Sequence, residues 1–486
     1  MKKTGRRIAI LLAAAMITGC AAQTPATPAT PAGQSTSGQE TSGQDTSGQE
    51  ATALDDFGAP SAENNADIVQ YDGVTAVLAR YPGGDGEEQD AENYVMSDAY
   101  AEWWDDYRNK IFASEELQEG MDDYYTAMMR EILVTDSTEN TVCSPLNIYV
   151  ALAMLAECTD GNTRAQILDV LEVPDVETLR TRVKVLWEAN YVDTPVVQSL
   201  LADSVWMREG VTYNEETLQR LAETYYASSF SGAMGTEQMD KALQSWMNDN
   251  TGGLLEDAIR DIHTRPETVL ALVSTIYFKA AWYDKFYEGL TDKQIFHGAE
   301  GDTEVDMMHR SDMMMYSQGD NFGAVEFVLN DSGSMFFFLP EEGQDVRELV
   351  TDPQMMQTLR GRLDNTDYVT VNLSVPKFRV EAKTDLMGTM QRLGMSDVMS
   401  AGLADFTPLT TDESLEDLAL SSAEHAAVVE VDEEGVTGAA YTIMMVAEGA
   451  MDMESDEIDF VLDRPFFFAV TAADGSILFT GIVQDI

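Results

Sequence analysis

The sequence predicts an α+β fold with one large domain over residues 116–486. Three observations support this prediction. Helical patterns dominate the first half of that region, strand patterns dominate the second half, and no evident linker interrupts it. The strands are too extensive for a small β-sandwich. Apolar residues make up 44% of the chain, which is enough to build a large core.

The helical half contains several well-marked segments. Residues 121–133 have the spacing of an amphipathic helix. The next helix is expected to begin with Ser144 as N-cap and Pro145 at its first position, and its apolar residues nearly circle the axis, which predicts a helix buried on most sides. Further helices are predicted over 162–171, with Asn162 or Thr163 as cap, over 215–226 and over 239–250.

The strand half is rich in aromatic and β-branched residues. Its last segment, 465–483, predicts two strands joined by a tight turn at Asp474-Gly475, because Asp-Gly is a strong hairpin signal. The other predicted strands lie within 268–282, 322–329, 334–340 and 368–380.

The N-terminus has the pattern of an export signal. Residues 1–19 combine the basic start "MKKTGRR" with the ten-residue apolar run "IAILLAAAMI", which suits a signal peptide and is too short to span a bilayer. The small residues before Cys20 resemble a bacterial lipoprotein box, in which this cysteine becomes a lipid anchor. The sequence therefore predicts a cell-surface lipoprotein, with plain secretion to the extracellular space as the alternative.

Two segments separate this signal from the predicted domain. Residues 20–53 contain "TPATPATPA" and three copies of a "TSGQ(E/D)" repeat, a composition typical of a flexible linker. Residues 54–115 are expected to form an extension packed on the main body. Within it, residues 68–82 predict a short strand or helix, and residues 98–112 predict a helix with its aromatic residues clustered.

Charge and cysteine content narrow the partners. The formal net charge of −56 repels phosphates and anionic lipid head groups, so we expect no nucleic-acid partner and membrane contact only through the N-terminal lipid. Cys143 and Cys158 flank one predicted helix, and the roughly 20 Å between them is far beyond the reach of a disulfide. The sequence predicts two buried free thiols.

Motifs of enzyme active sites are absent from the sequence. The chain has four histidines and contains no G-x-S-x-G, no H-E-x-x-H, no phosphate-binding loop and no zinc spacing. Acidic stretches such as "GDTEVD" lack the EF-hand pattern and are predicted to be solvated loops. We therefore expect no enzyme activity, no catalytic residue, no metal and no cofactor, and we interpret His425 as a structural histidine.

The segment 428–460 carries the most unusual pattern. It begins and ends as a strand, and between Gly435 and Ile458 it holds small residues, methionines and acids but no Lys or Arg. Long loops in compact domains are usually functional or disordered. On a strand, Val436, Gly438, Ala440 and Thr442 would share one face that is small to medium in size and uncharged. Such a stretch can be exposed, and it could also fit between two existing strands.

Several ordered blocks of the sequence resemble the serpin family of serine protease inhibitors, over residues 121–486. The blocks are "ENTVCSPLNIYVALAMLAECTDGNTRAQIL", "VLALVSTIYFKAAWYDKF", "VDMMHRSD", "SVPKFRVEAKTDLMGTMQRLGM", "HAAVVEVDEEGVTGAAY" and "DRPFFFAVTAADGSILFTGIV". The resemblance implies a serpin fold, with a large central mixed β-sheet, further sheets, about nine helices and an exposed reactive-centre loop.

The resemblance also assigns roles to residues. The reactive-loop hinge would comprise Glu433, Glu434, Gly435, Val436, Thr437, Gly438, Ala439 and Ala440. The scissile bond would lie within Val446–Glu454, a region that includes Ala447, Glu448, Gly449, Ala450 and Met451. The region where the sheet opens would comprise Asn140, Ser144, Asn147, Ser274 and His425.

The function implied is suicide-substrate inhibition of extracellular serine proteases by a chain expected to be a monomer. A covalent complex would form when the cleaved loop inserts into the central sheet. The absence of Lys and Arg from the loop favours elastase-, chymotrypsin- or subtilisin-like targets. Departures from the family pattern at Val436 and Tyr441 leave an alternative, a non-inhibitory serpin-fold lipoprotein that binds a partner at the cell surface. Departures at Asn147 and Ser274 concern how easily the sheet opens.

Overall fold

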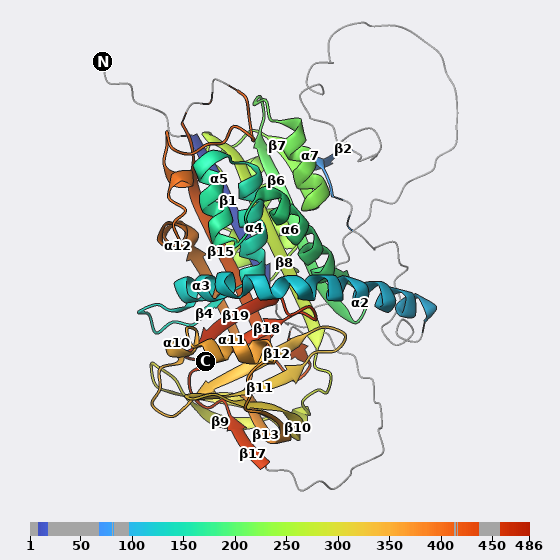
Figure 1. The fold of residues 1–486 in the computed structure, drawn as a ribbon, viewed down its shortest axis with the longest axis vertical. Helices are drawn as coiled ribbons and strands as arrows, with labels where there is room; N and C mark the ends of the chain where they lie inside the picture. Colours follow the sequence, from blue (N-terminus) through green and yellow to red (C-terminus); the bar gives the residue numbers. More distant parts are fainter. Residues whose placement is uncertain are drawn as a thin grey trace, which may run out of the picture.

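The protein is described by a computed structural model that covers residues 8–17, 68–79, 81, 97–412, 415, 417–436 and 457–486. Within this part of the chain, helices fill the first half and strands the second, as the patterns predict (Figure 1). Eleven α-helices occur among the described residues: α2 Asp98–Gln118, α3 Asp122–Leu133, α4 Pro145–Glu157, α5 Gly161–Val170, α6 Val176–Asn190, α7 Glu215–Thr224, α8 Glu237–Asp249, α9 Glu256–Ile259, α10 Val346–Leu349, α11 Pro353–Leu359 and α12 Leu386–Arg392.

The predicted start of helix α4 is confirmed, whereas helix α5 starts earlier than predicted and has a different N-cap. Helix α4 begins at Pro145 with Ser144 at the N-cap, and every residue of the helix is buried, yet the Ser144 side chain makes no capping hydrogen bond. Helix α5 begins at Gly161 with Asp160 at the N-cap, so the prediction of Asn162 or Thr163 as cap is wrong. Gly161 has φ +56°, a conformation that glycine adopts without strain and that starts the helix earlier than predicted.

The larger of the two sheets is mixed and forms the centre of the molecule. Its strands run in space β14–β15–β1 and β16–β8–β6–β7–β3–β2, with β5 beside β6. Their bounds are β1 Ile8–Ile17, β2 Ile68–Tyr71, β3 Val74–Val77, β5 Val192–Asp193, β6 Val197–Arg208, β7 Ala227–Gly232, β8 Thr268–Ala281, β14 Phe378–Asp385, β15 Leu418–Val431 and β16 Gly435–Val436.

The second sheet has nine strands in the order β17–β13–β10–β11–β12–β18–β19–β4, with β9 beside β10. Their bounds are β4 Thr141–Cys143, β9 Asp292–His297, β10 Asp302–Gln318, β11 Phe322–Val328, β12 Ser334–Pro340, β13 Thr366–Pro376, β17 Glu457–Val461, β18 Phe466–Thr471 and β19 Ile477–Val483. The hairpin β18–β19 turns at the predicted Asp474-Gly475, where Gly475 has φ +81°.

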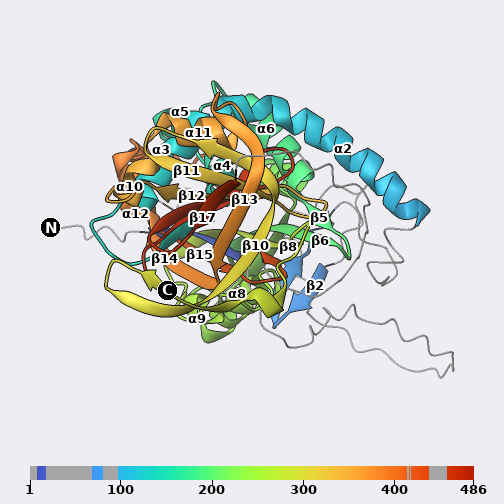
Figure 2. The ribbon, with the colours of Figure 1, turned by 90° about the horizontal axis from the view of Figure 1, so that it is seen from below.

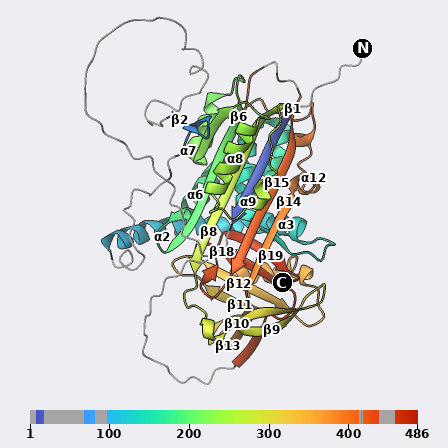
Figure 3. The ribbon, with the colours of Figure 1, turned by 180° about the vertical axis from the view of Figure 1, so that it is seen from behind.

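Helices cover both faces of the central sheet. Helices α4, α5 and α6 lie on the face seen in Figure 1, and α8 and α9 lie on the opposite face seen in Figure 3. The main core fills the space between α3, α4, α6, the central sheet and the second sheet, and a separate buried cluster lies under α8 and α9. The central sheet is therefore buried on both sides over much of its length.

The described part of the N-terminal extension, residues 68–79, 81 and 97–115, packs on this body. Helix α2 projects past the side of the sheets (Figure 2), and its Tyr107 and Ile111 are buried beside Trp103 and Trp104. The hydroxyl of Ser114 donates to a carboxylate oxygen of Asp474 at 2.5 Å, which fastens α2 to the β18–β19 turn. The segment 68–82, predicted as a strand or helix, provides the strands β2 and β3.

Two further predictions about the chain can be compared with the described residues. Cys143 and Cys158 are both free and buried, as predicted, and burial raises the pKa of each thiol well above its usual range. Both are therefore packing residues at neutral pH. Among the described helices, none combines the length and apolar character that crossing a membrane requires.

Candidate functional site: the loop hinge and the slot in the central sheet

In the central sheet, β8 and β15 are separated by the width of one strand. We call this position between them the slot. Strand β1 lies in it and runs parallel to both neighbours, with Ala14 opposite Ser274 on β8 and opposite His425 on β15. Residues 8–17, predicted from sequence as the core of a signal peptide, thus form a strand in this chain. The slot accepts a strand that pairs on both sides.

The predicted hinge enters the same slot from the other end. Strand β15 turns back after Val431, and Val436 pairs with Val431 on one side and with Ala280 of β8 on the other, antiparallel to both. Val436 is fully buried. A Cβ atom on Gly435 would lie 2.3 Å from the carbonyl oxygen of Ala280, so glycine is required at this close approach.

Acidic side chains hold the turn that carries the hinge. Asp432 Oδ1 accepts hydrogen bonds from the backbone N–H groups of Glu434 and Gly435 at 2.8 and 3.2 Å. Glu433 forms an ion pair with Lys377 at 2.5 Å, and Glu434 pairs with Lys285. The turn is thereby tied to two different segments of the body.

The ionisation of Glu433 follows from these contacts. Burial acts to raise the pKa of this carboxyl, but the hydrogen bonds from Lys377 and from the Thr291 hydroxyl outweigh it, and the net pKa is lowered. Glu433 is therefore ionised at neutral pH and keeps its partners. Its role here is to fix the register in which Gly435 and Val436 enter the slot.

The remaining loop residues of interest lie outside the described residues. These are the hinge residues Thr437, Gly438, Ala439 and Ala440 and the region of the predicted scissile bond, Val446, Ala447, Glu448, Gly449, Ala450 and Met451. The chain is described again from Glu457, where β17 pairs with β13 of the second sheet. The predicted lipid-anchor residue, Cys20, also lies outside the described residues.

Four of the five residues predicted at the sheet-opening region meet under the middle of the slot. Asn147 Nδ2 donates to Ser274 Oγ at 2.6 Å, and the backbone N–H of Ser144 donates to His425 Nε2 at 3.1 Å. Helix α4 thus bonds to β8 through Asn147 and to β15 through Ser144. These two bonds connect one helix to both strands that flank the slot.

Three polar atoms in this cluster are buried without a hydrogen-bond partner among the described residues: Ser144 Oγ, Asn147 Oδ1 and His425 Nδ1. Burial lowers the pKa of His425 to about 3, so the ring is neutral. The strand position opposite both Ser274 and His425 is occupied by Ala14, a residue type with no polar side-chain group. Among the described residues, the cluster therefore has unused capacity for hydrogen bonds.

The grouping of Asn140 with these residues was wrong. Its Oδ1 accepts from the backbone N–H groups of Gln484 and Asp485 at 2.6 and 3.0 Å, and its Nδ2 donates to the carbonyl of Asp485 at 2.7 Å. These three bonds fasten the residues that follow β19, and none of them joins Asn140 to the strands that flank the slot.

Sequence reasoning missed Asp203, a fully buried carboxyl on β6 directly opposite Ser274. Burial raises its pKa to about 7, although hydrogen bonds from Ser274 and from Trp187, whose Nε1 lies 3.1 Å from Oδ2, act to lower it. The signal in the sequence is a lone acid within the apolar run "LLADSVWM". A carboxyl with this pKa changes its protonation close to neutral pH, beside the polar cluster under the slot.

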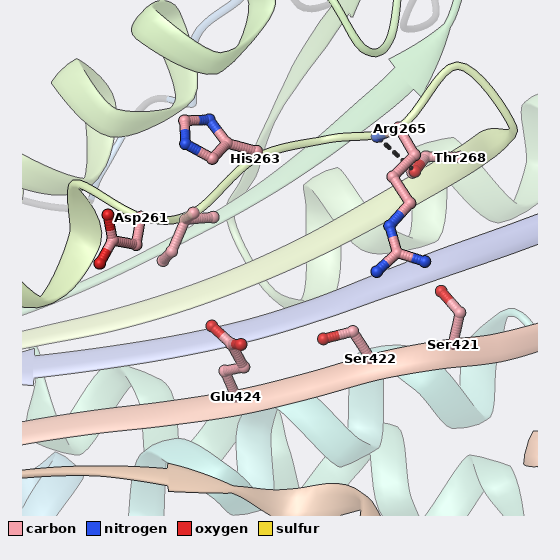
Figure 4. Close-up of a pocket in the computed structure, with 8 residues that line it drawn as sticks. Asp261, His263, Arg265, Thr268, Ser421, Ser422 and Glu424 are labelled. Atoms are coloured by element: carbon pink, nitrogen blue, oxygen red, sulfur yellow. Dashed lines mark hydrogen bonds between the residues drawn. The ribbon is translucent and has the colours of Figure 1, made fainter.

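A pocket of about 300 Å³ lies beside the far end of the slot (Figure 4). Thr268 of β8 and Ser422 and Glu424 of β15 line it from the two sides of the slot, and β1 runs between them. His263 and Glu424 already have partners, Asp240 at 3.1 Å and Lys383 at 3.0 Å. No group of three or more metal-ligating side chains occurs anywhere in the part of the chain that the structure describes.

Comparisons with known proteins agree with this geometry. The profile of the family described as Serpin (serine protease inhibitor) matches residues 119–486. Among curated proteins, an antitrypsin of Bombyx mori is 25% identical over 76% of this chain and 94% of its own length. Plasminogen activator inhibitor 1 of Mus musculus is 27% identical over 75% of this chain and 91% of its own length.

Among solved structures, the native state of the thermophilic serpin tengpin matches with a TM-score of 0.66 at 24% identity, over 76% of this chain and 93% of that one. This likeness concerns the fold. The family profile covers well over half of the chain and includes the hinge and both strands that flank the slot. The chain therefore belongs to the serpin family.

Proposed function

We propose that the protein inhibits extracellular serine proteases as a suicide substrate, trapping the acyl-enzyme by inserting its cleaved loop into the slot between β8 and β15. One observation carries the proposal. The loop leaves the body as a strand that is already paired antiparallel with both flanking strands, at the mouth of a gap that accepts a strand.

The register of Val436 defines how the loop would continue. Each further loop residue pairs one residue earlier on β8 and on β15. Ala440 would then lie between Ile276 and Ala427, and Thr442 would lie between Ser274 and His425. Strand β1 gives an independent check, because its Ala14 also lies opposite Ser274 and His425. The two flanking strands are aligned in the same way for either occupant.

This register explains the pattern of small residues. Paired residues on neighbouring strands point to the same side, and the side chains of Ser274 and His425 point toward α4. Gly438, Ala440 and Thr442 would therefore face the main core, where Ile276 and Ala427 are fully buried. The Thr442 hydroxyl would reach the cluster that contains the unpartnered Ser144 Oγ, Asn147 Oδ1 and His425 Nδ1.

The chemistry of the reaction belongs to the protease. Its serine Oγ attacks the carbonyl carbon of the scissile peptide bond, the Oγ proton passes through the protease's histidine to the leaving amine, and the C–N bond breaks. The N-terminal part of the loop remains joined to the protease as an ester. The serpin supplies a substrate segment and the slot, and none of its own side chains transfers a proton in this step.

Trapping follows from the gain in strand pairing. The freed loop inserts and forms hydrogen bonds with β8 and β15 on its two sides, as in other serpin loop insertions. Because the ester joins the protease to the end of the inserting segment, the protease is carried along the sheet and distorted before water hydrolyses the ester. The inhibitor is consumed in one turnover.

The sequence of the loop sets the class of target. We place the scissile bond within Val446–Glu454, where Val446, Ala447, Ala450 and Met451 suit elastase-, chymotrypsin- or subtilisin-like specificity pockets. The proposal includes export by residues 1–19 and a lipid on Cys20, with residues 20–53 holding the inhibitor away from the membrane as a monomer. Such a protein would meet proteases outside the cell that produces it.

The test is incubation with an elastase-like and a subtilisin-like protease, followed by denaturing gels. A band that survives the detergent, at the summed mass less the released C-terminal fragment, supports the proposal. Mass spectrometry of that fragment identifies the scissile bond. Cleavage without any such band, for proteases of both classes at equimolar ratio, would contradict it.

One observation favours a second candidate, a non-inhibitory serpin that binds a partner at the cell surface. In the register above, Tyr441 would lie between Thr275 and Ala426 and face the opposite side, where Ala426 belongs to the buried cluster under α8 and α9. A tyrosine that must pass under this layer would slow insertion. This candidate predicts that proteases cleave the parent protein without being trapped. It also predicts that the Tyr441→Ala variant traps them.

A further inference from the structure

A hairpin of the N-terminal extension extends the central sheet. Strands β2 and β3 are joined by a tight turn in which Asp72 and Gly73 have φ +46° and +83°. Strand β3 pairs antiparallel with β7, with Ala76 opposite Phe230, and Ala76 is fully buried. These residues precede residue 119, where the match to the family profile begins. The hairpin thus lies outside the part of the chain that the family profile matches, and it extends the edge of the sheet.

The hairpin also binds both ends of helix α8. The hydroxyl of Tyr71 donates to Asp249 Oδ2 at 2.6 Å in the last turn of the helix, and Gln238 Nε2 in the first turn donates to the carbonyl of Gly73 at 2.7 Å. Burial and the neighbouring Asp249 carboxylate raise the pKa of Tyr71, so its phenol stays protonated and remains a donor. Helix α8 is held to the sheet edge by these two bonds.

Helix α8 begins a segment that crosses the slot, which we call the cover segment (residues 237–262). Its apolar side chains share one buried cluster with Ala271 and Val273 of β8 and with Ala426 and Val428 of β15. Figure 3 shows α8 and α9 over the strands on this face. The layer therefore contacts both strands that must part when the slot is filled.

The far end of the cover segment is fastened on the other side of the slot. Arg379 and Lys383 of β14 donate to the carbonyls of Leu254 and Ala258 at 3.4 and 3.5 Å. The cover segment is therefore attached to the β2–β3 edge at one end and to β14 at the other. A strand that enters the slot has to pass beneath a layer held on both sides.

We propose that the β2–β3 hairpin regulates loop insertion, with Tyr71 as a positioning residue that holds helix α8 over the slot. This rests on the proposed function, because it concerns the rate of that insertion. The hydrogen bond between Tyr71 and Asp249 is present while β1 occupies the slot. This bond is therefore compatible with a slot that holds a strand. We expect the bonds that hold helix α8 to lower the rate at which β8 and β15 separate.

The test compares Tyr71→Phe with Tyr100→Phe in the protein purified after export. Tyr100 provides a matched control, because its hydroxyl also donates to an aspartate, Asp331 Oδ1 at 3.0 Å, but on helix α2, outside the cover segment. Two quantities are measured: amide hydrogen exchange over residues 237–249 in the intact protein, and the rate at which protein nicked in the loop becomes heat-resistant. The second control is Asp249→Asn, which keeps an acceptor for Tyr71.

Tyr71→Phe is expected to raise both rates about tenfold, the order that follows from losing one hydrogen bond to a charged group. Tyr100→Phe and Asp249→Asn should stay within about threefold of the parent. Unchanged exchange in α8 would overturn the fastening, and faster exchange with an unchanged insertion rate would overturn the regulation. If the nicked parent never becomes heat-resistant, the proposed function fails, while the exchange comparison still tests the fastening.

Discussion

Replacing Ala440 by Glu should abolish trapping while leaving cleavage intact. In the register set by Val436, this side chain enters the core between Ile276 and Ala427, both fully buried. An isolated buried carboxyl has to be protonated, which costs about 1.4 kcal/mol for each unit between the pH and a normal glutamate pKa near 4.3. At pH 7.5 this is about 4 kcal/mol, and insertion becomes roughly a thousandfold less favourable.

The assay is the ratio of covalent complex to cleaved inhibitor at several pH values. Because the protonation cost falls to about 1 kcal/mol at pH 5, trapping by the variant should partly recover in acid. Thr437→Glu is the matched control, since the same acid would then lie on the opposite face, beside Lys279 and Glu430 at partly exposed positions. If Ala440→Glu forms as much covalent complex as the control at pH 7.5, residue 440 does not face the main core. The register set by Val436 would then be wrong.

Three further predictions follow from the slot. Because burial raises the pKa of Asp203 from 3.8 to about 7, the stability that depends on its protonation is complete below pH 4 and lost as the pH rises to 7. Asp203→Asn should therefore raise the free energy of unfolding by up to about 4 kcal/mol at pH 8 and leave it nearly unchanged at pH 4. Urea unfolding measures both values, and an equal shift of the midpoint at the two pH values would argue against this reasoning. Gly435→Ala should lower the fraction of protease trapped, because the new Cβ would lie 2.3 Å from the Ala280 oxygen; a parent-like ratio on gels would show that the hinge can shift freely. A chain that keeps residues 1–19 should be cleaved without trapping, since β1 occupies the slot, and inhibition equal to that of a chain starting at Cys20 would contradict that occupancy.

Much of the fold follows from local patterns in the sequence. Pro145 after Ser144 placed the start of α4, and Asp474-Gly475 placed the terminal hairpin, because both depend on backbone preferences of a few residues. The hinge assignment comes from the resemblance to the serpin family and stays a prediction, and the structure adds a physical reason for glycine at position 435, where a Cβ atom would collide with the neighbouring strand. These features are encoded within short segments.

The remaining features depend on partners that are distant in the sequence. The partners of the Asn140 side chain cannot be read from nearby residues. The folded chain brings residues 484–485 beside it, and their backbone N–H groups donate to its Oδ1. The apolar run 8–17 suits a secretory signal and a buried parallel strand equally well, because neither requires polar alternation. The effect of Asp203 on the slot arises because β6 pairs with β8 in a register that places this acid opposite Ser274.

The measurement that tests the central claim most directly is the melting temperature of a chain starting at Cys20, before and after a single nick within residues 446–454. We expect the nicked protein to unfold at a markedly higher temperature than the intact protein, because the freed loop becomes a strand between β8 and β15. Identical melting curves for the two forms would contradict the claim that the slot receives the loop.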